Sequence, residues 1–547
     1  MPGKLTTTLL STLLMLLSNV SAQPETSITL LHFSDYHSHA LPFYAEGDSG
    51  VAGVARAIAY LKPYASDPNS LIFSGGDMIN RGSPAWSDKY QYIEWTWFNG
   101  IINAMAFGNH DADYGFQAFD QIKQQIDYPI LGSNILDNQG IPLFQYNGKT
   151  YEVYTIDDIK VGVFAVAGDD FQELLKPATS PTENARFAHR IETARMIVAQ
   201  LKDVELVNAI VVIGHATYQD DLALAQAVPG IDLIFGSHSH RKQNLTHIPK
   251  TDTWIISPSQ YLTYISKVKL SFVEGALSEM SGELIRMDGN LVEDAQISSQ
   301  VAIMQLGLES DPSYSHLYQQ IGFAGTELAI TGQFEGESKL GNLVSDIVRH
   351  AAGAHAALLT SSSFRQPIPP GRILEENLMT ALPYKNNIHI IEMTGGQVKK
   401  LLDFSVSQIG SDHFSQVSGI RFEIEKNQAI NIQILDSPED KQASYSALNP
   451  QQTYRIATSN YQALYASGYK DIFSQLSSIE TDIDVWTIFR DYLNVHSPIN
   501  IQLDGRIIQN TDLEQSEVIK PSPALVNRVP LYLISLVAIL LAGGLLI

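Results

Sequence analysis

The sequence predicts an α/β fold in the N-terminal half of the chain and a separate α+β domain after it. Three observations support this prediction. Apolar runs of strand length alternate with longer amphipathic stretches between residues 28 and 236. The chain has 547 residues, more than one ordinary domain needs, and its hydrophobic content of 44% allows a sizeable core. Beyond residue 325 the regular alternation ends, and helical and strand-like segments follow in mixed order.

Five apolar runs predict the strands of the first domain, which we place at residues 23–295. The runs cover residues 28–33, 70–74, 103–107, 209–214 and 231–236. Between them, GVARAIAYLKPYA, GFQAFDQIKQQI and RIETARMIVAQLKDV have the length and spacing of helices. The second half of residues 261–275 alternates apolar with polar side chains, which indicates antiparallel strands at a sheet edge.

A mostly helical connector is expected at residues 296–324, followed by a second domain at residues 325–510. In the second domain an amphipathic helix is expected over residues 339–354, and a strand follows within residues 355–363. This mixture of helices and strands is typical of an α+β domain.

Both ends of the chain differ in composition from the rest. Residues 1–22 contain a lysine, a short apolar run and the small-residue pattern Val20-Ser21-Ala22, which is typical of a secretory signal peptide. Residues 529–547 carry no charge and approach the ~20 residues of a spanning helix, after a polar linker at 511–528. We expect an exported protein, periplasmic or at the cell surface, with a C-terminal transmembrane anchor. The alternatives are a buried helix or a lipid-anchor signal that is removed.

The overall charge and the absence of cysteine exclude several classes of function. The formal net charge is −23, which argues against a nucleic-acid polymer as a partner. A small anionic substrate then needs a local positive centre, such as bound metal. The chain contains no cysteine, so disulfides, zinc–thiolate sites and thiol catalysis are excluded.

Each of the five predicted strands ends at a turn that carries Asp, Asn or His. In chain order these residues are Asp35 and His37, Asp77, Asn109, His215, and His238 and His240. Loops at the carboxyl ends of strands line the ligand crevice of an open α/β sheet. A single histidine or Gly-Gly-Asp turn is more often an ordinary loop feature. Five such turns together favour one shared site.

Seven oxygen and nitrogen ligands are too many for one tetrahedral ion, and they match two ions ~3.5–4 Å apart with one bridging carboxylate. Asp77 is the best candidate for the bridge, because its strand is central among the five. Ligands of this kind accept Zn, Mn, Fe or Co. A metal pair acidifies a bridging water and neutralises phosphoryl oxygens, so we predict hydrolysis of phosphate esters.

The blocks DYH (35–37), GGDMINRG (75–82), GNHDADYG (108–115), IGHATYQDD and GSHSH resemble the signature blocks of the calcineurin-like metallophosphoesterases. Their order, with the C-terminal domain, resembles the secreted 5′-nucleotidase and UDP-sugar hydrolase family over residues 27–510. This resemblance implies a four-layer αββα sandwich followed by a 5′-nucleotidase C-terminal domain. It implies that Asp35, His37, Asp77 and His240 hold one metal, and that Asp77, Asn109, His215 and His238 hold the other.

The resemblance also implies roles for residues around the metals. His110 would meet the phosphoryl group or the leaving oxygen, and Asp113, in preference to Asp111, would orient it. Asn109 and Arg365 would bind the phosphate, and Tyr469 would stack on a base. The second stacking position falls near Ile388, which has no ring, and Phe334 stands where a further arginine is expected. Tyr384 is either an alternative ring or a core aromatic.

We therefore expect hydrolysis of nucleoside 5′-monophosphates to nucleoside and phosphate outside the cytoplasm. One alternative is the same chemistry on 2′,3′-cyclic nucleotides, nucleotide sugars or a non-nucleotide phosphate. The other is a non-catalytic binding protein at the cell surface. Metal analysis separates this last alternative, because only the enzyme requires about two ions per chain.

Overall fold

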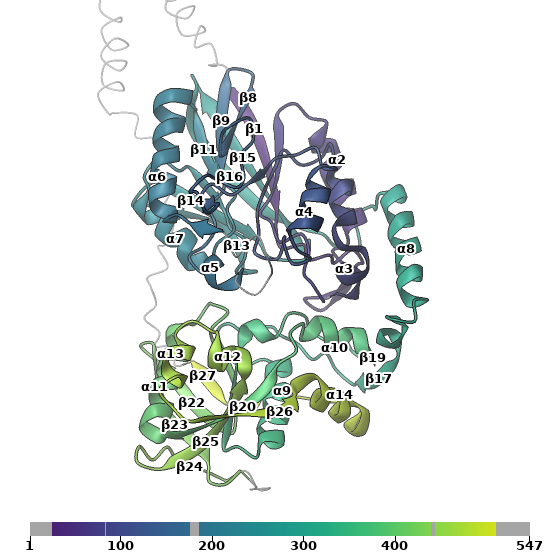
Figure 1. Ribbon diagram of the computed structural model, residues 1–547, viewed down its shortest axis with the longest axis vertical. Helices are drawn as coiled ribbons and strands as arrows, with labels where there is room; N and C mark the ends of the chain where they lie inside the picture. The colour runs from purple at the N-terminus through teal and green to yellow at the C-terminus, as the bar shows by residue number, and fades with distance from the viewer. Residues whose placement is uncertain (1–24, 83, 176–184, 439–443, 510–547) are drawn as a thin grey trace, which may run out of the picture.

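The computed structural model describes residues 25–82, 84–175, 185–438 and 444–509, which form two domains joined by a helical connector (Figure 1). The connector helix α8 (Ala295–Glu309) runs along one side of the molecule, from the first domain to the second. A short helical turn, η4 (Ser315–Tyr318), follows it. These two elements lie at the start of the stretch 296–324 in which a helical connector is expected.

Two six-stranded sheets form the middle of the first domain, and their core strands run parallel. The first sheet consists, in spatial order, of β16 (Ala276–Arg286), β15 (Tyr264–Val273), β1 (Glu25–Phe33), β4 (Ser70–Ser74), β5 (Ala104–Ala106) and β6 (Ile130–Leu131). The second consists of β13 (Lys242–Ile248), β14 (Thr253–Pro258), β12 (Leu233–Phe235), β11 (Ala209–Val212), β9 (Ile159–Phe164) and β8 (Tyr151–Ile156).

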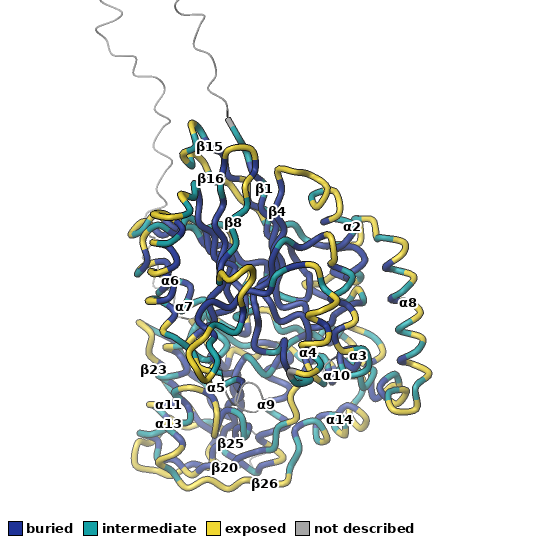
Figure 2. The backbone as a smooth tube through the Cα atoms, turned by 45° about the horizontal axis from the view of Figure 1, so that its top comes forward, coloured by how far each residue is buried: buried dark blue, intermediate teal, exposed yellow. Residues whose placement is uncertain are grey.

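Apolar side chains that alternate along the strands fill both sides of each sheet. In β1, Ile28 and Leu30 belong to the core between the two sheets, while Leu31 and Phe33 belong to the core beneath the outer helices. The helices α2 (Val54–Ala65) and α4 (Phe116–Lys123) cover the first sheet, and α6 (Arg190–Gln200) and α7 (Tyr218–Ala227) cover the second. The result is the predicted αββα sandwich. Figure 2 shows that many of its buried residues lie in the strands between the helical layers.

Smaller elements complete the first domain. They are β2 (Phe43–Ala45), β3 (Asp48–Val51), α3 (Ala85–Tyr90), η1 (Gln91–Phe98), β7 (Ile135–Leu136), α5 (Phe171–Leu174), β10 (Arg186–Phe187) and η3 (Leu201–Glu205). All five predicted strands are present, and β15 pairs antiparallel with β1 and β16, as expected. The hairpin formed by β8 and β9 was not predicted.

The second domain contains a five-stranded sheet, a four-stranded sheet and helices on both sides. The five-stranded sheet consists of β21 (Ser415–Ser418), β18 (Ala356–Thr360), β25 (Thr453–Ser459), β20 (Asn387–Thr394) and β26 (Ser478–Asp484). The four-stranded sheet consists of β24 (Tyr445–Ala447), β23 (Gln428–Leu435), β22 (Ile420–Glu425) and β27 (Ile507–Gln509). The helices are α9 (Lys339–Ala352), η5 (Ser361–Ser363), α10 (Glu375–Ala381), α11 (Gly395–Ser407), α12 (Asn460–Leu464), α13 (Tyr469–Phe473) and α14 (Val485–His496).

The strand pairing of the second domain begins slightly before the boundary expected at residue 325. The strand β17 (Gln320–Ala324) pairs antiparallel with β19 (Gly371–Leu374), so the last part of the expected connector belongs to the second domain.

Among the described residues, no helix has the length and hydropathy needed to cross a bilayer. The expected signal peptide at 1–22, the linker at 511–528 and the anchor at 529–547 all lie outside the described residues.

Candidate active site

The loops that follow β1 and β4 are joined by backbone hydrogen bonds. The amides of Asp35 and His37 donate to the carbonyl oxygens of Gly76 and Asp77, each at 3.0 Å. The loop after β5 approaches so closely that a Cβ atom at Gly108 would collide with the carboxylate and the backbone of Asp77. Glycine is therefore required at position 108, because any side chain there would separate the two loops.

Five of the seven predicted metal ligands have backbone conformations in the left-handed region. They are Asp35 (φ 53°), His37 (φ 49°), Asp77 (φ 51°), His238 (φ 55°) and His240 (φ 52°). This conformation costs roughly 1 kcal/mol for each residue with a side chain. Strain of this kind concentrates at functional sites, where it aims side chains that an ordinary turn would direct elsewhere.

The structure brings six of the seven predicted ligands, all except Asn109, into two adjacent groups. Asp35, His37 and His240 form one group, and Asp77, His215 and His238 form the other, with the ligand atoms of each group within 4.8 Å of one another. Asp77 Oδ2 lies 3.2 Å from His215 Nε2 and 3.7 Å from His37 Nε2. Asp77 therefore stands between the groups, where a bridging carboxylate is needed.

Three predicted ligand atoms are buried without a hydrogen-bond partner in the described part of the chain: Asp35 Oδ1, Asn109 Oδ1 and His215 Nε2. Leaving such atoms unpaired is unfavourable unless a ligand compensates them. His215 Nδ1 lies 2.6 Å from the carbonyl oxygen of Gly75, to which it can donate, so that Nε2 keeps a lone pair. Carboxylate, amide and imidazole lone pairs facing one space fit divalent cations.

The electrostatics of the first group favour the protonation states that metal binding needs. Burial lowers the pKa of His37 well below its usual value, and burial together with Arg365 does the same for His240. Neutral imidazoles and ionised carboxylates are the forms that bind metal.

In the second group, burial opposes the ionisation of Asp77, yet His215 and His110 hold its pKa well below the usual range. Burial lowers the pKa of both histidines of this group, but Asp77 raises that of His215 to about 10 and Asp170 raises that of His238, so metal binding there must displace a proton.

His110 and Asp113 form the expected pair, and the centroid of the His110 ring lies 5.3 Å from that of the His37 ring in the first group. His110 Nδ1 lies 2.8 Å from Asp113 Oδ2, and both side chains are largely buried. Asp111 has a different role, because its carboxylate accepts hydrogen bonds from the backbone amides of Gly108 (2.7 Å), Met78 (2.8 Å) and Asp77 (3.1 Å). Asp111 therefore fixes the loops, and Asp113 is the acid that contacts His110.

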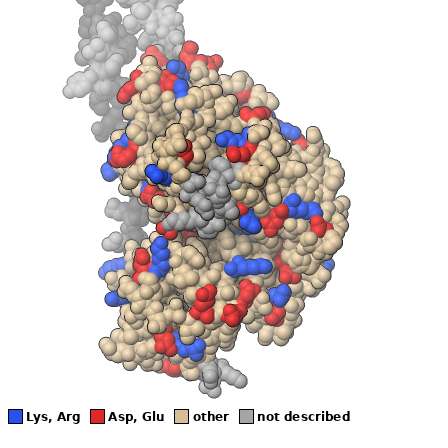
Figure 3. All heavy atoms as spheres, viewed as in Figure 1, with Lys and Arg blue, Asp and Glu red and all other residues tan. Residues whose placement is uncertain are grey.

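Arg365 reaches from the second domain to the metal ligands of the first. Its guanidinium contacts His240 Nδ1 and donates to the Tyr384 hydroxyl at 3.3 Å. Gln260 of the first domain donates to the carbonyl oxygen of Arg365 at 3.2 Å. The predicted phosphate-binding arginine thus lies at the junction of the two domains, where a hollow is visible in Figure 3.

Tyr469, which we expected to stack on a base, belongs instead to the core of the second domain. Its side chain is 0% exposed, and its hydroxyl donates to the carbonyl oxygen of His413 at 2.8 Å. The ring packs edge-on against Phe404, with centroids 4.8 Å apart, and also contacts Phe473. These contacts leave no face of the ring free for a base.

Tyr461 is the aromatic residue that the sequence analysis missed. It lies in the first turn of α12, half-buried, where burial and the nearby Asp412 raise its pKa to about 12. Arg365 and Tyr384 also lie close enough to influence this pKa, and Tyr384 is 37% exposed. No local signal in the sequence separates Tyr461 from the buried ring eight residues later, because both lie in the first turn of a short helix.

Replacing Tyr469 with leucine is expected to lower the free energy of unfolding by about 2–4 kcal/mol, because it removes a packed ring and a buried hydrogen bond. The KM of the Tyr469→Leu variant for substrate should equal that of the wild type. Tyr461→Ala, by contrast, should raise KM about tenfold without a comparable loss of stability. Urea denaturation and steady-state kinetics measure both effects. A raised KM in the folded Tyr469→Leu variant would contradict the assignment of Tyr469 to the core.

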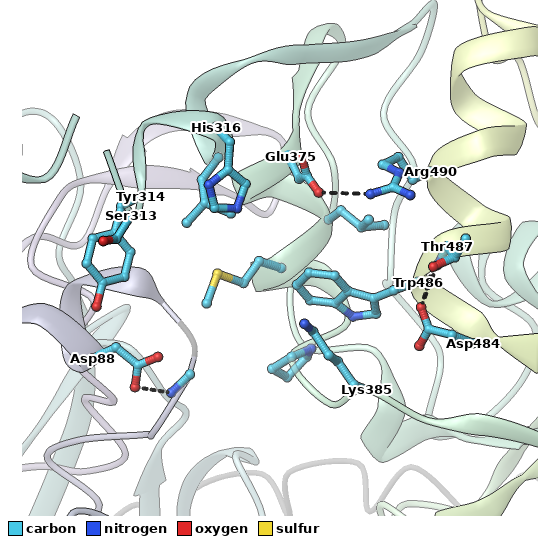
Figure 4. Close-up of a pocket in the computed structure, with 15 residues that line it drawn as sticks. Asp88, Ser313, Tyr314, His316, Glu375, Lys385, Asp484, Trp486, Thr487 and Arg490 are labelled. Atoms are coloured by element: carbon cyan, nitrogen blue, oxygen red, sulfur yellow. Dashed lines mark hydrogen bonds and ion pairs between the residues drawn. The ribbon is translucent and has the colours of Figure 1, made fainter. Parts of the chain in front are cut away.

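A pocket of about 590 Å³ opens between the domains on the side of the connector (Figure 4). Tyr314 and Trp486 stand on opposite sides of it, and none of the predicted metal ligands lines it. On its wall, Asp88 accepts a hydrogen bond from the amide of Gly82, and Glu375 forms an ion pair with Arg490. This pocket is separate from the two ligand groups.

Comparisons with known proteins match both domains. The first matches the calcineurin-like phosphoesterase family over residues 28–242, and the second matches the 5′-nucleotidase C-terminal domain over residues 319–475. Protein UshA of Yersinia enterocolitica is 24% identical over 522 residues, which cover 86% of this chain and 92% of that protein. Human 5′-nucleotidase is 24% identical, over 88% of this chain and 90% of its own.

The fold also matches solved structures. The crystal structure of a 5′-nucleotidase precursor from Thermus thermophilus superimposes with a TM-score of 0.72 at 24% identity, covering 88% of this chain and 99% of the other. The two families follow each other in one chain, the first with the grouped ligands and the second with Arg365. The chain therefore carries a calcineurin-like phosphoesterase domain followed by a 5′-nucleotidase C-terminal domain, and it is a metal-dependent phosphoric ester hydrolase.

Proposed function

We propose that the enzyme hydrolyses nucleoside 5′-monophosphates to a nucleoside and phosphate. One observation carries this proposal: Arg365 of the second domain contacts the ligand group of the first, with Tyr384 and Tyr461 close by. A guanidinium suits the phosphate, and two partly exposed rings suit a base. The likeness to proteins named 5′-nucleotidase supports the same substrate class.

The seven predicted ligands would hold two divalent ions of Zn, Mn, Fe or Co. They are Asp35, His37, Asp77, Asn109, His215, His238 and His240. When bound, such a pair of ions activates water and neutralises the charge of the phosphoryl oxygens. The protein side chains fix this geometry in advance, because the loops that carry them are held by backbone hydrogen bonds and buried carboxylates.

His110 would donate a proton to the oxygen that leaves with the nucleoside. Burial lowers the pKa of the imidazole, but Asp113 and Asp77 raise it well above the ordinary value, which favours the protonated form that can donate. Asp113 holds Nδ1, which leaves Nε2 free to face the substrate. A charged imidazole therefore both stabilises the phosphoryl group and supplies the proton that the leaving alkoxide needs.

Replacing Arg365 with alanine is expected to raise KM for AMP about 10- to 100-fold, because a charge-assisted contact to phosphate is lost. The metal content should not change, since Arg365 is not among the metal ligands. Arg372→Ala, an exposed arginine of the same domain, serves as the control. An unchanged KM for AMP would remove Arg365 from the substrate site.

Phosphate release by the purified protein tests the substrate class directly. AMP, UDP-glucose, 2′,3′-cyclic AMP and p-nitrophenyl phosphate are compared with added Mn²⁺ or Zn²⁺, and a coupled phosphatase reveals cleavage that leaves a phosphomonoester. We expect AMP to be turned over fastest. If only one of the other compounds is turned over, the protein is still a phosphoric ester hydrolase, but its substrate is that compound's class and not nucleoside 5′-monophosphates. Bound metal without any turnover would favour a surface binding protein.

We also propose that the enzyme works outside the cytoplasm, in the periplasm or at the cell surface, tethered by its C-terminal segment. This proposal is supported only by the sequence of residues 1–22 and 529–547. Fractionation of cells with and without a carbonate wash, followed by N-terminal sequencing, tests both the export and the anchor.

A further inference from the structure

A cavity of about 230 Å³ lies at the meeting point of the first domain, the connector and the second domain. The loop at residues 38–44 forms one wall, Gln305 of α8 forms another, and residues 366–369 with one side of α10 close it. Its volume corresponds to about eight water molecules, or to one small ring with its substituents. None of the predicted metal ligands lines this cavity.

Buried polar groups of this cavity lack hydrogen-bond partners within the described residues. His39 Nε2 and Gln366 Nε2 are unpaired, although these residues are only 8% and 7% exposed. Gln305 Oε1 is unpaired as well. His39 Nδ1 lies 2.9 Å from the carbonyl oxygen of His37 and can donate to it, which makes Nε2 an acceptor in the neutral ring. The cavity therefore offers an amide donor and two acceptors that the protein does not satisfy.

The remaining wall combines apolar and polar side chains, the polar ones being Ser38, Tyr44, Glu376, Asn377 and Thr380. Prolines at 42, 84, 367 and 369 and the side chain of Phe43 line the cavity. The acid in the wall, Glu376, accepts a hydrogen bond from Tyr318, and burial raises its pKa to about 7. Apolar surfaces combined with hydrogen-bond donors and acceptors that the protein leaves unpaired suit a ring that carries hydroxyl groups.

We propose that this cavity binds one uncharged hydroxylated ring, a pentose or a hexose, and thereby holds the two domains in the arrangement of Figure 1. Its walls come from both domains and the connector, so the binding site is complete only when these parts are together. His39 stacks on Tyr261, with ring centroids 3.6 Å apart, and Tyr261 contacts His37 and His240 edge-on or tilted. The ring of Tyr261 thus lies between His39, in the cavity wall, and the first group of predicted metal ligands.

This inference concerns binding alone, and it stands whether or not the enzyme prefers nucleotides. Isothermal titration of the metal-loaded full-length protein with D-ribose, D-glucose and uridine tests it, and the three arms distinguish a free sugar from the ribose of a nucleoside. We expect one site per chain for at least one of them. The variant Gln366→Leu should weaken binding about tenfold or more, because it removes a buried hydrogen-bond donor.

Two further variants keep the experiment decisive. His39→Phe preserves the ring on Tyr261 and removes Nε2, so it should weaken binding even if Gln366→Leu folds poorly. Gln428→Leu, at an exposed position of β23, should bind like the wild type. No binding of any of the three compounds at tens of millimolar would show that the cavity holds only water. Unchanged affinity in both cavity variants would place the bound compound elsewhere, and either result would overturn the proposal.

Discussion

Replacing Asp77 with asparagine is expected to reduce kcat/KM about a thousandfold or more. Asp77 Oδ2 lies between the two ligand groups, 3.2 Å from His215 Nε2 and 3.7 Å from His37 Nε2, so its charge is shared by both. Asparagine keeps the oxygen that accepts from the amide of His110 at 2.8 Å, so the loop should retain its shape. The lost negative charge is worth several kcal/mol in metal binding and transition-state stabilisation.

The same variant should lose metal as well as activity. Elemental analysis is expected to give about two ions per chain for the wild type and fewer than one for Asp77→Asn. Asp158→Asn, in the exposed turn between β8 and β9, removes one carboxylate far from the ligands and should change neither quantity. Full metal content in Asp77→Asn would show that the two groups bind their ions independently of this residue.

Much of the first domain was predictable because its central strands are apolar throughout. Parallel strands covered on both sides read as continuous hydrophobic runs, as in SLIFS (70–74) and AIVV (209–212), which are completely buried. The hairpin of β8 and β9 was missed because YEVYTI exposes several of its side chains and its turn, Asp157-Asp158, gives a weak local signal. The strand β17 was assigned to the connector because its partner β19 lies about fifty residues away in the sequence.

The same division between local and distant information applies to the site. The predicted metal ligands could be expected to lie together because each follows a strand closely, so its place in the fold depends on local sequence. The choice between Tyr461 and Tyr469 was not local. Both begin short helices, and only packing against Phe404 of α11, more than fifty residues earlier, buries Tyr469. Burial of an aromatic ring is decided by its neighbours in space, which the motif does not contain.

Replacing His110 with glutamine is expected to lower kcat about 10²- to 10⁴-fold, since the proton donor for the leaving oxygen is lost. The metal content should remain at the wild-type value, because His110 belongs to neither ligand group. Loss of activity without loss of metal distinguishes the role of His110 from that of Asp77, because replacing Asp77 is expected to remove both activity and metal. His316→Gln changes an exposed histidine of the connector and serves as the matched control. Loss of metal in His110→Gln would mean that His110 supports the ligands and does not act on the substrate.

The pH dependence of kcat gives a second, independent test of His110. Because Asp113 and Asp77 raise the pKa of His110, its active, protonated form extends to higher pH than in an ordinary histidine and is lost as the pH rises through the raised pKa. Asp113 is the largest of the charges that raise it, so Asp113→Asn should move the alkaline fall in kcat to lower pH. At acid pH, where the imidazole is protonated in both proteins, the variant should recover most of its rate. A profile that falls in height without moving along the pH axis would show that Asp113 only positions the ring.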